Sequence, residues 1–205
     1  MSNNQTYKNR ALASLDGKWT NAVVASLIVF LISGVGSSVV ALPAGNDIVA
    51  SNGISSIWGL ICMPLSWGAE VYFLNLIRNL DISYERLFDG YKDFIRIFLA
   101  MFLVTIAVLF GLVLLIVPGI IIGLMFSMTE FILKDHPEMG AADAIALSCR
   151  MTNGHKMEIF WLTLSFIGWF LLSCLTLGLG FLLLYPYYSA TMAQYYEDLK
   201  AETGL

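Results

Sequence analysis

Long apolar runs alternate with short polar stretches along the whole chain. The clearest run, Ile97 to Val117, has 21 residues without a charge. A second run, Ile120 to Leu133, follows the dipeptide Pro118-Gly119, and Glu130 is its single charged residue. About 20 apolar residues span a hydrocarbon core of about 30 Å. Pro-Gly is typical of a turn, because Pro cannot continue a helix and Gly tolerates a positive φ. The two runs therefore predict a transmembrane helical hairpin that turns at Pro118-Gly119.

The same pattern occurs before and after this hairpin. Apolar runs at residues 21–42 and 54–77 form an earlier pair, and runs at 159–177 and 181–196 form a later one. We therefore predict an all-α membrane fold and a single domain over residues 1–205. Its six transmembrane helices would form three hairpins, at about residues 21–77, 97–133 and 159–196. Three polar segments, at about residues 7–19, 78–93 and 134–158, are expected to form amphipathic helices on the cytoplasmic face.

The composition excludes an ordinary soluble globular domain. The 205 residues are 58% hydrophobic and 13% charged, whereas soluble domains are about 45–50% apolar and about 25% charged. The net charge of -4 gives no reason to expect a nucleic-acid partner. Cys62, Cys149 and Cys174 lack the spacing of a metal or redox motif. We therefore expect no metal and no cofactor.

The basic residues predict the orientation in the membrane. All 11 Lys and Arg residues fall on one side of the six-helix topology, and the positive-inside rule places both termini in the cytoplasm. The same side also carries every acidic residue except Asp47, Glu70 and Glu130. Because its charges nearly balance, this face does not have the pattern of a polybasic lipid-binding patch.

A recurring sequence unit indicates an internal repeat of three parallel hairpins. Each hairpin follows an amphipathic segment that ends in the dipeptide Asp16-Gly17, Asp89-Gly90 or Asn153-Gly154. A Lys and an aromatic residue or Met follow each dipeptide within three residues. Late in the second helix of each hairpin, a polar residue lies beside aromatic ones: Glu70, Glu130 and Gln194. The alternative is that Gly, Lys and an aromatic residue are simply common where a chain meets a membrane.

Glu70 is the first candidate for an intramembrane polar site. It lies eight positions before Arg78, so it would be about 12 Å deeper along a helix that rises ~1.5 Å per residue. An acid at the centre of a membrane helix costs roughly 2.5–3.5 kcal/mol and is expected to face the bundle interior or water. Glu70 would bind a proton, a cation or a headgroup, or else hold neighbouring helices together.

Glu130 and Gln194 complete the candidate polar site. Glu130 is the weaker acid candidate, because Lys134 at i+4 can form an ordinary helix ion pair with it. If the repeat is real, Glu70, Glu130 and Gln194 would meet near a pseudo-threefold axis.

Three tyrosines surround Pro186 inside the last apolar run. Tyr185, Tyr187 and Tyr188 would line a cavity if Pro186 kinks the helix, which neighbouring helices in a membrane can support. The alternative is that the three rings only pack against neighbouring helices.

Four segments resemble a known family. They are RALASLDGKWTNAV near the start, LLIVPGIIIGLMFSMTEFILKDHPEM, AADAIALSCRMTNGHKMEIFWLTLSFIGWFLL and LTLGLGFLLLYPYYSATMAQYYEDL. Together they are similar to a family of uncharacterised bacterial integral membrane proteins, a domain of unknown function. This family is distantly similar to the membrane domain attached to some glycerophosphodiester phosphodiesterases. The resemblance implies a multi-pass protein of the bacterial inner membrane but supplies no activity and no site residues.

The motif content predicts a protein that is not an enzyme. The chain has no GxxxxGK[ST] loop, no HExxH and no GxSxG, and its only histidines are His136 and His155. We expect a non-enzymatic inner-membrane module that binds or moves a lipid or small amphiphile, with membrane lipids as its partners. The alternative is a membrane scaffold or modulator subunit. It would dock a protein partner, or a second copy of the chain, through residues 78–93 and 134–158.

Overall fold

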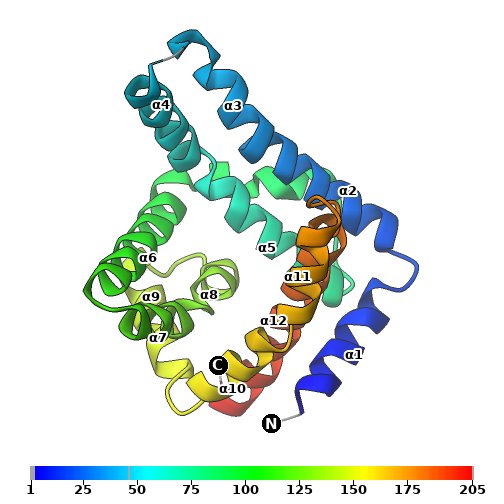
Figure 1. Cartoon of the computed structure of the whole chain (residues 1–205). Helices are drawn as coiled ribbons and strands as arrows, with labels where there is room; N and C mark the ends of the chain where they lie inside the picture. The colour runs from blue at the N-terminus through cyan, green and yellow to red at the C-terminus, as the bar shows by residue number, and fades with distance from the viewer. Residues whose placement is uncertain (1–2, 46, 205) are drawn as a thin grey trace.

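The computed structural model describes residues 3–45 and 47–204, and every regular element in them is helical (Figure 1). This confirms the predicted all-α fold. The α-helices are α1 (Asn4–Leu15), α2 (Trp19–Phe30), α3 (Gly36–Ala41), α4 (Ile48–Ile61), α5 (Met63–Ile77), α6 (Phe94–Leu114), α7 (Ile116–Phe126), α8 (Thr129–Asp135), α9 (Ala141–Met151), α10 (Lys156–Leu164), α11 (Ile167–Leu175) and α12 (Phe181–Thr203). A π-helical turn η1 (Leu31–Val35) and two 3₁₀ segments, η2 (Leu42–Ala44) and η3 (Tyr84–Tyr91), complete the set.

Several helices are long and apolar enough to cross a membrane, as expected for a multi-pass membrane protein. Four continuous stretches qualify: Trp19–Ala44, Phe94–Leu114, Ile116–Asp135 and Lys156–Leu175. A fifth would be the pair α4 and α5, which is bent by 40° at Cys62. Helix α12 is not among them, because tyrosines and charged residues occupy much of its length. The sixth span and the arrangement as three transmembrane hairpins stay predictions.

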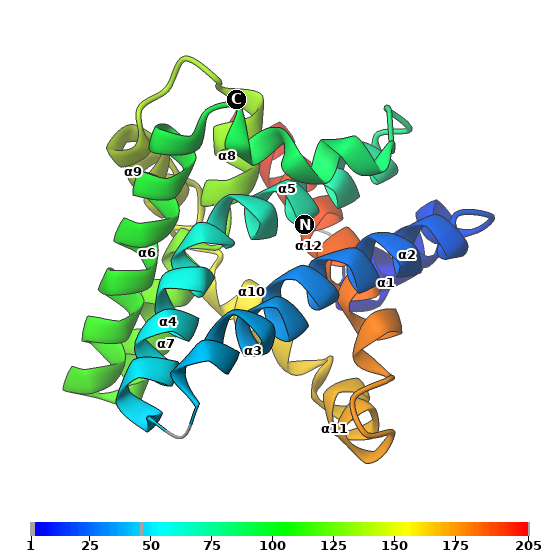
Figure 2. The same ribbon diagram turned by 90° about the horizontal axis from the view of Figure 1, so that it is seen from above.

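Three helix pairs extend to one side of the molecule. Figure 2 shows the turns of α3–α4, α6–α7 and α11–α12 on its lower side and the C-terminus on the opposite side. Small residues allow each pair to approach closely: Gly36 faces the Trp58 ring, and Gly180 lies against Ser173. The Trp58 indole also donates a 2.9 Å hydrogen bond to the carbonyl oxygen of Ile32.

The turn between α6 and α7 lies at Leu115, so the prediction of a turn at Pro118-Gly119 was wrong. Leu115 is extended, with φ −164° and ψ 148°. Pro118 instead occupies the first turn of α7. Backbone N–H groups in the first turn have no acceptor within the helix, so a residue without an N–H is tolerated there. Gly119 is used for close packing, since a Cβ on Gly111 would lie 2.9 Å from its Cα.

The three polar segments pack on the body of the protein in a cyclic order. Helix α1 packs against α12, η3 against α5, and α9 against α8. The segments at residues 7–19 and 134–158 contain α-helices as predicted. Between residues 78 and 93 the chain forms turns and the 3₁₀ segment η3 instead of an α-helix.

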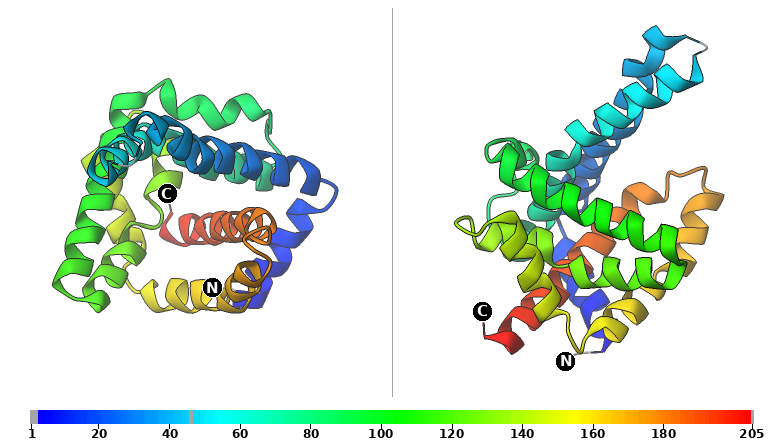
Figure 3. Two further views of the ribbon diagram at one scale, coloured as in Figure 1. Left: turned by 45° about the horizontal axis from the view of Figure 1, so that its top comes forward. Right: turned by 90° about the vertical axis from the view of Figure 1, so that its left-hand side faces the viewer.

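The packed core lies where α5, α8, α9 and α12 meet. Helix α5 is buried on nearly every side, and the rings of Tyr72 and Phe73 are fully enclosed. The left view of Figure 3 shows α12 in the middle of the other helices. The projecting helix pairs, by contrast, carry exposed apolar side chains such as Val113 and Leu177, which are 84% and 97% exposed. The molecule therefore has a well-packed body and an apolar outer surface suited to lipid.

An ion-pair network joins the C-terminal parts of the three central helices. Arg78, just after α5, contacts Asp135 of α8 through two hydrogen bonds of 2.6 and 2.7 Å. Arg78 also pairs with Glu197 of α12 at 2.5 Å, and Lys200 pairs with Asp135 at 2.5 Å. The hydrogen bonds from Arg78 to Asp135 and Glu197 hold the pKa of the guanidinium above its ordinary value. The network therefore holds the C-terminal ends of α5, α8 and α12 together.

Candidate functional site

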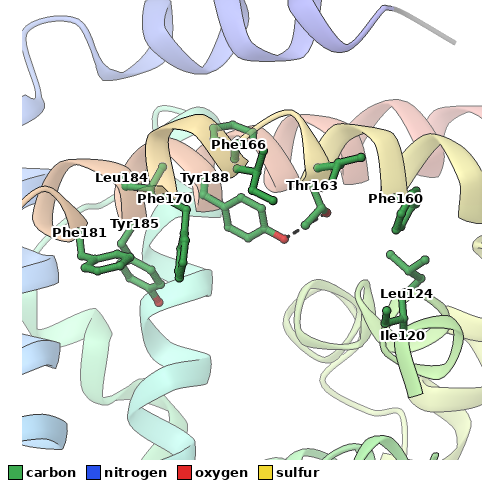
Figure 4. A pocket seen from close by; sticks show the side chains of 12 residues that line it. Ile120, Leu124, Phe160, Thr163, Phe166, Phe170, Phe181, Leu184, Tyr185 and Tyr188 are labelled. Carbon is green, nitrogen blue, oxygen red and sulfur yellow. Dashed lines mark hydrogen bonds between the residues drawn. The ribbon is translucent and has the colours of Figure 1, made fainter. Parts of the chain in front are cut away.

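An apolar cavity of about 500 Å³ lies between α7 and the helices α10 to α12. Figure 4 shows aromatic and aliphatic side chains around it, including Leu124, Phe160, Phe166 and Phe170. Its volume falls in the usual range of ligand pockets, about 300–1,000 Å³. A cavity with such walls can hold an acyl or alkyl chain.

A break between α10 and α11 places Phe166 in the wall of this cavity. The break leaves the carbonyl oxygen of Ser165 without a helical partner, and Lys8 of α1 donates a 2.8 Å hydrogen bond to it. The Lys8 ammonium also lies 4.2 Å from the centre of the Phe166 ring. The Phe166 ring in turn packs edge-to-face on Tyr188. A buried cation from the first helix thus stabilises one wall of the apolar cavity.

A second, acidic cavity of about 230 Å³ adjoins the first. Glu70 of α5 and Glu130 of α8 both line it, together with side chains of α6, α7 and α12 such as Met101, Phe126 and Met192. Tyr188 lines both cavities. The structure therefore brings two of the three predicted polar residues to one cavity, next to an apolar one.

Glu70 is held by two hydroxyl groups of α12. Its Oε1 accepts hydrogen bonds from Tyr185 at 3.1 Å and from Ser189 at 2.9 Å. Tyr185 and Ser189 are four residues apart, so they lie on the same face of the helix. Ser189 was not predicted, although its i+4 spacing from a candidate tyrosine was a usable signal.

Glu130 faces the same cavity without a bonded partner for its carboxyl group among the described residues. The expected ion pair with Lys134 is not formed there, so this structural interpretation of Glu130 was wrong. The backbone carbonyl of Glu130 accepts a 2.9 Å hydrogen bond from the Trp67 indole, which positions the residue. The adjacent Thr129 is 1% exposed, and its hydroxyl also has no hydrogen-bond partner. Both residues belong to the cavity wall, so this wall has unused hydrogen-bonding capacity.

Gln194 lies elsewhere, which makes the predicted meeting of three polar residues wrong. Its side-chain amide donates a 3.1 Å hydrogen bond to the Ser14 hydroxyl of α1. Gln194 follows Ser189 by five residues, which places it about 140° around the helix axis at 3.6 residues per turn. It therefore points away from the face of α12 that holds Glu70.

Of the three tyrosines around Pro186, two line the apolar cavity and one does not. Tyr185 and Tyr188 line the apolar cavity, as predicted. Tyr187 does not; its ring packs edge-to-face on Phe166 and Trp169. Pro186 lies within α12, which continues as one helix from Phe181 to Thr203.

The two cavities together have the polarity of an amphiphile. The apolar cavity has no charged residue in its described wall, and the acidic cavity has two carboxyl groups. Within residues 3–45 and 47–204, no group of three His, Cys, Asp or Glu side chains is arranged to hold a metal ion. The geometry thus favours binding of an organic molecule with one apolar and one polar end.

The C-terminal half of the chain matches a known family. Residues 104–203 match the model of a family described as "Protein of unknown function (DUF975)". The matched region includes α7, α8 and α12, and so most of both cavities. No curated protein and no solved structure matches the chain significantly. The likeness to the membrane domain of glycerophosphodiester phosphodiesterases stays a prediction.

Proposed function

We propose that this protein is a non-enzymatic module of the bacterial inner membrane that binds a lipid or other small amphiphile. The observation that carries the proposal is the pair of adjoining cavities, one apolar and about 500 Å³, the other acidic and about 230 Å³. The apolar cavity would take the hydrocarbon chain and the acidic cavity the headgroup. Transport would require, in addition, that the bound molecule is released on the opposite side of the membrane from the side where it enters.

The order of the cavities along α12 supports a ligand from the cytoplasmic leaflet. Phe181 and Tyr185 border the apolar cavity, Tyr188 borders both, and Met192 borders the acidic one. The apolar cavity is therefore nearer the turns of the helix pairs, and the acidic cavity is nearer the side with the Lys and Arg residues. The positive-inside rule makes that side cytoplasmic, together with both termini.

The packing order also supports the proposed threefold repeat. Each polar segment that opens a unit packs on the second helix of the unit before it, and α1 packs on α12 of the last unit. In a six-span topology, α12 would then cross the membrane as the equivalent of α4–α5 and α7–α8. Glu70 and Glu130 would be equivalent residues that the repeat brings to one cavity.

Native mass spectrometry of the protein released from mild detergent tests the proposal. We expect the wild type to retain a lipid or metabolite. Leu124→Trp, which fills the apolar cavity, should remove most of it, and Glu70→Gln should weaken its retention. Val113→Trp is the matched control, because residue 113 is 84% exposed on a helix surface. Equal retention by all four proteins, each shown to be folded by size-exclusion chromatography, would contradict a binding role for the cavities.

The scaffold function remains the alternative proposal. The cytoplasmic helix α9 buries its apolar side chains, including Ala144 and Leu147, against the core. A docking partner would therefore contact mainly polar side chains there. In the same experiment, a co-purifying protein together with empty cavities would favour the scaffold.

A further inference from the structure

We propose that the acidic cavity binds the primary ammonium group of an amphiphile at the level of the cytoplasmic headgroups. This inference rests on the proposed function and adds the chemical class and the depth of the ligand. Three features support it: the charged segment beside α5, the hydrogen-bonding groups of the cavity, and the absence of a cation in its described wall.

The charged segment η3 lies beside the first half of α5. Backbone contacts fix this position, because a Cβ on Gly68 would lie 2.0 Å from the carbonyl oxygen of Leu87. A Cβ on Gly90 would likewise lie 2.2 Å from the carbonyl oxygen of Pro64. In addition, the Tyr91 hydroxyl donates a 2.9 Å hydrogen bond to the carbonyl oxygen of Ile61. The chain therefore returns along α5 as far as its bend with α4.

The side chains of η3 mark the boundary of the membrane. Asp89 accepts hydrogen bonds from Lys92 at 2.7 Å and from Arg86 at 3.3 Å, and Lys92 is 74% exposed. Exposed charges of this kind belong in the headgroup region, since the hydrocarbon core strongly disfavours them. The stacked rings of Phe88, Tyr91 and Phe94 follow at this level, and aromatic belts are typical of the interface.

This boundary revises the depth expected for Glu70. The eight positions from Glu70 to Arg78 predict a depth of about 12 Å for Glu70. The charged segment beside residues 61–68 puts the headgroup level at the start of α5, near Cys62. Glu70, further along α5, therefore lies at the level of the cytoplasmic headgroups rather than deep in the hydrocarbon core.

The acidic cavity offers mainly hydrogen-bond acceptors. The hydroxyls of Tyr185 and Ser189, beside the cavity, both donate to Oε1 of Glu70. Of the hydroxyls in its wall, that of Ser127 donates to the Leu124 carbonyl oxygen and that of Tyr188 lies 3.5 Å from the Thr163 hydroxyl. Glu130 also lines the cavity, and the buried hydroxyl of the adjacent Thr129 has no hydrogen-bond partner. Among the described residues, no Lys or Arg lines the acidic cavity. Arg78, just after α5, forms ion pairs with Asp135 and Glu197.

A primary ammonium group matches this wall better than other headgroups do. It carries a positive charge and three N–H donors, and bonds from such a cation to a carboxylate are charge-assisted. A trimethylammonium group has the charge but no donor, and a phosphate or carboxylate would bring further acceptors to a described wall that has no Lys or Arg. The attached chain can continue past Tyr188 into the apolar cavity.

The test compares probes with the same chain and different headgroups on the delipidated, full-length wild type. Dodecylamine, dodecyltrimethylammonium and dodecanol represent free amphiphiles. Phosphatidylethanolamine, phosphatidylcholine and phosphatidylglycerol with identical acyl chains represent membrane lipids. By native mass spectrometry, we expect the primary amine of at least one series to bind about tenfold more tightly than its trimethylated analogue. The series that shows this preference identifies the source of the ammonium group.

Variants connect the preference to the cavity. Glu130→Gln should reduce the preference for the primary amine by about tenfold, whereas Glu138→Gln should keep it, because Glu138 is a 72% exposed surface acid. Equal binding of the amine and its trimethylated analogue, or a preference unchanged in Glu130→Gln and Glu70→Gln, would overturn the ammonium site. If Leu124→Trp still abolished binding in that case, the amphiphile-binding function would stand. If no probe bound the wild type, both proposals would fail.

Discussion

Asp135 is the acceptor at the centre of the ion-pair network, and Asp135→Asn should strongly destabilise the protein. Its carboxylate receives two hydrogen bonds from Arg78 at 2.6 and 2.7 Å, one from Lys200 at 2.5 Å and one from the Tyr196 hydroxyl at 3.0 Å. An asparagine keeps one acceptor oxygen and presents an NH₂ group to surrounding donors. The substitution therefore removes a negative charge and places an N–H donor against the donors of Arg78, Lys200 and Tyr196. The Asp135 side chain is only 8% exposed, so water has little access to it.

The structure allows an estimate of the effect. Removing one partner of a buried ion pair costs about 3–5 kcal/mol. Arg78 is 22% exposed and keeps Glu197 at 2.5 Å, and Lys200 is 27% exposed. Because water and Glu197 compensate in part, we expect the lower end, about 3 kcal/mol of unfolding free energy.

Reversible unfolding by SDS in mixed micelles, followed by far-ultraviolet circular dichroism, measures this loss. Asp93→Asn is the matched control, because Asp93 is 50% exposed and pairs with Arg96 three residues later. The control should change the unfolding free energy by at most about 1 kcal/mol. The reasoning would be refuted if Asp135→Asn were no more destabilising than Asp93→Asn.

Two further predictions test the packing of η3 and the orientation of the chain. Gly68→Ala should destabilise the protein by more than 1 kcal/mol in the same assay, since its new Cβ would meet a backbone oxygen at 2.0 Å. Gly59→Ala, with no atom near its Cβ position, should be neutral or stabilising, and an equal effect of the two would argue against the close contact. In a cysteine-free background, a membrane-impermeant thiol reagent should label Leu115→Cys from the periplasm and Ser83→Cys only after the cells are opened. The reverse pattern would contradict cytoplasmic termini.

Much of the fold could be predicted from apolar runs, because burial in lipid demands long uninterrupted ones. The predicted helix at residues 97–117 corresponds to α6, Phe94–Leu114. The exact turn could not be predicted, since Pro118 is acceptable in the first turn of a helix and Leu115 carries no turn signal. The 3₁₀ form of η3 was also beyond prediction, because it depends on Gly68 and Gly90 meeting backbone atoms that are distant in the sequence.

The candidate site could be predicted only in part. Glu70 and Glu130 were identifiable because a charge within an apolar run needs a reason to be there. The rotation of α12 about its axis decides that Ser189 reaches Glu70 while Gln194 reaches Ser14, and the sequence does not reveal this rotation. The apolar walls gave no signal, because residues such as Leu124 resemble every other apolar residue of a membrane helix.

The packing of α1 on α12 has a consequence for how the protein is made. Lys8 bonds to Ser165, 157 residues later, and Arg10 pairs with Asp198, 188 residues later. Helix α1 therefore meets these partners only after the chain has been synthesised through residues 165 and 198. Until then Tyr7, Ala11 and Leu15 have no α12 to bury them. A chain that stops before residue 181 lacks α12, so these apolar side chains of α1 stay accessible to proteases.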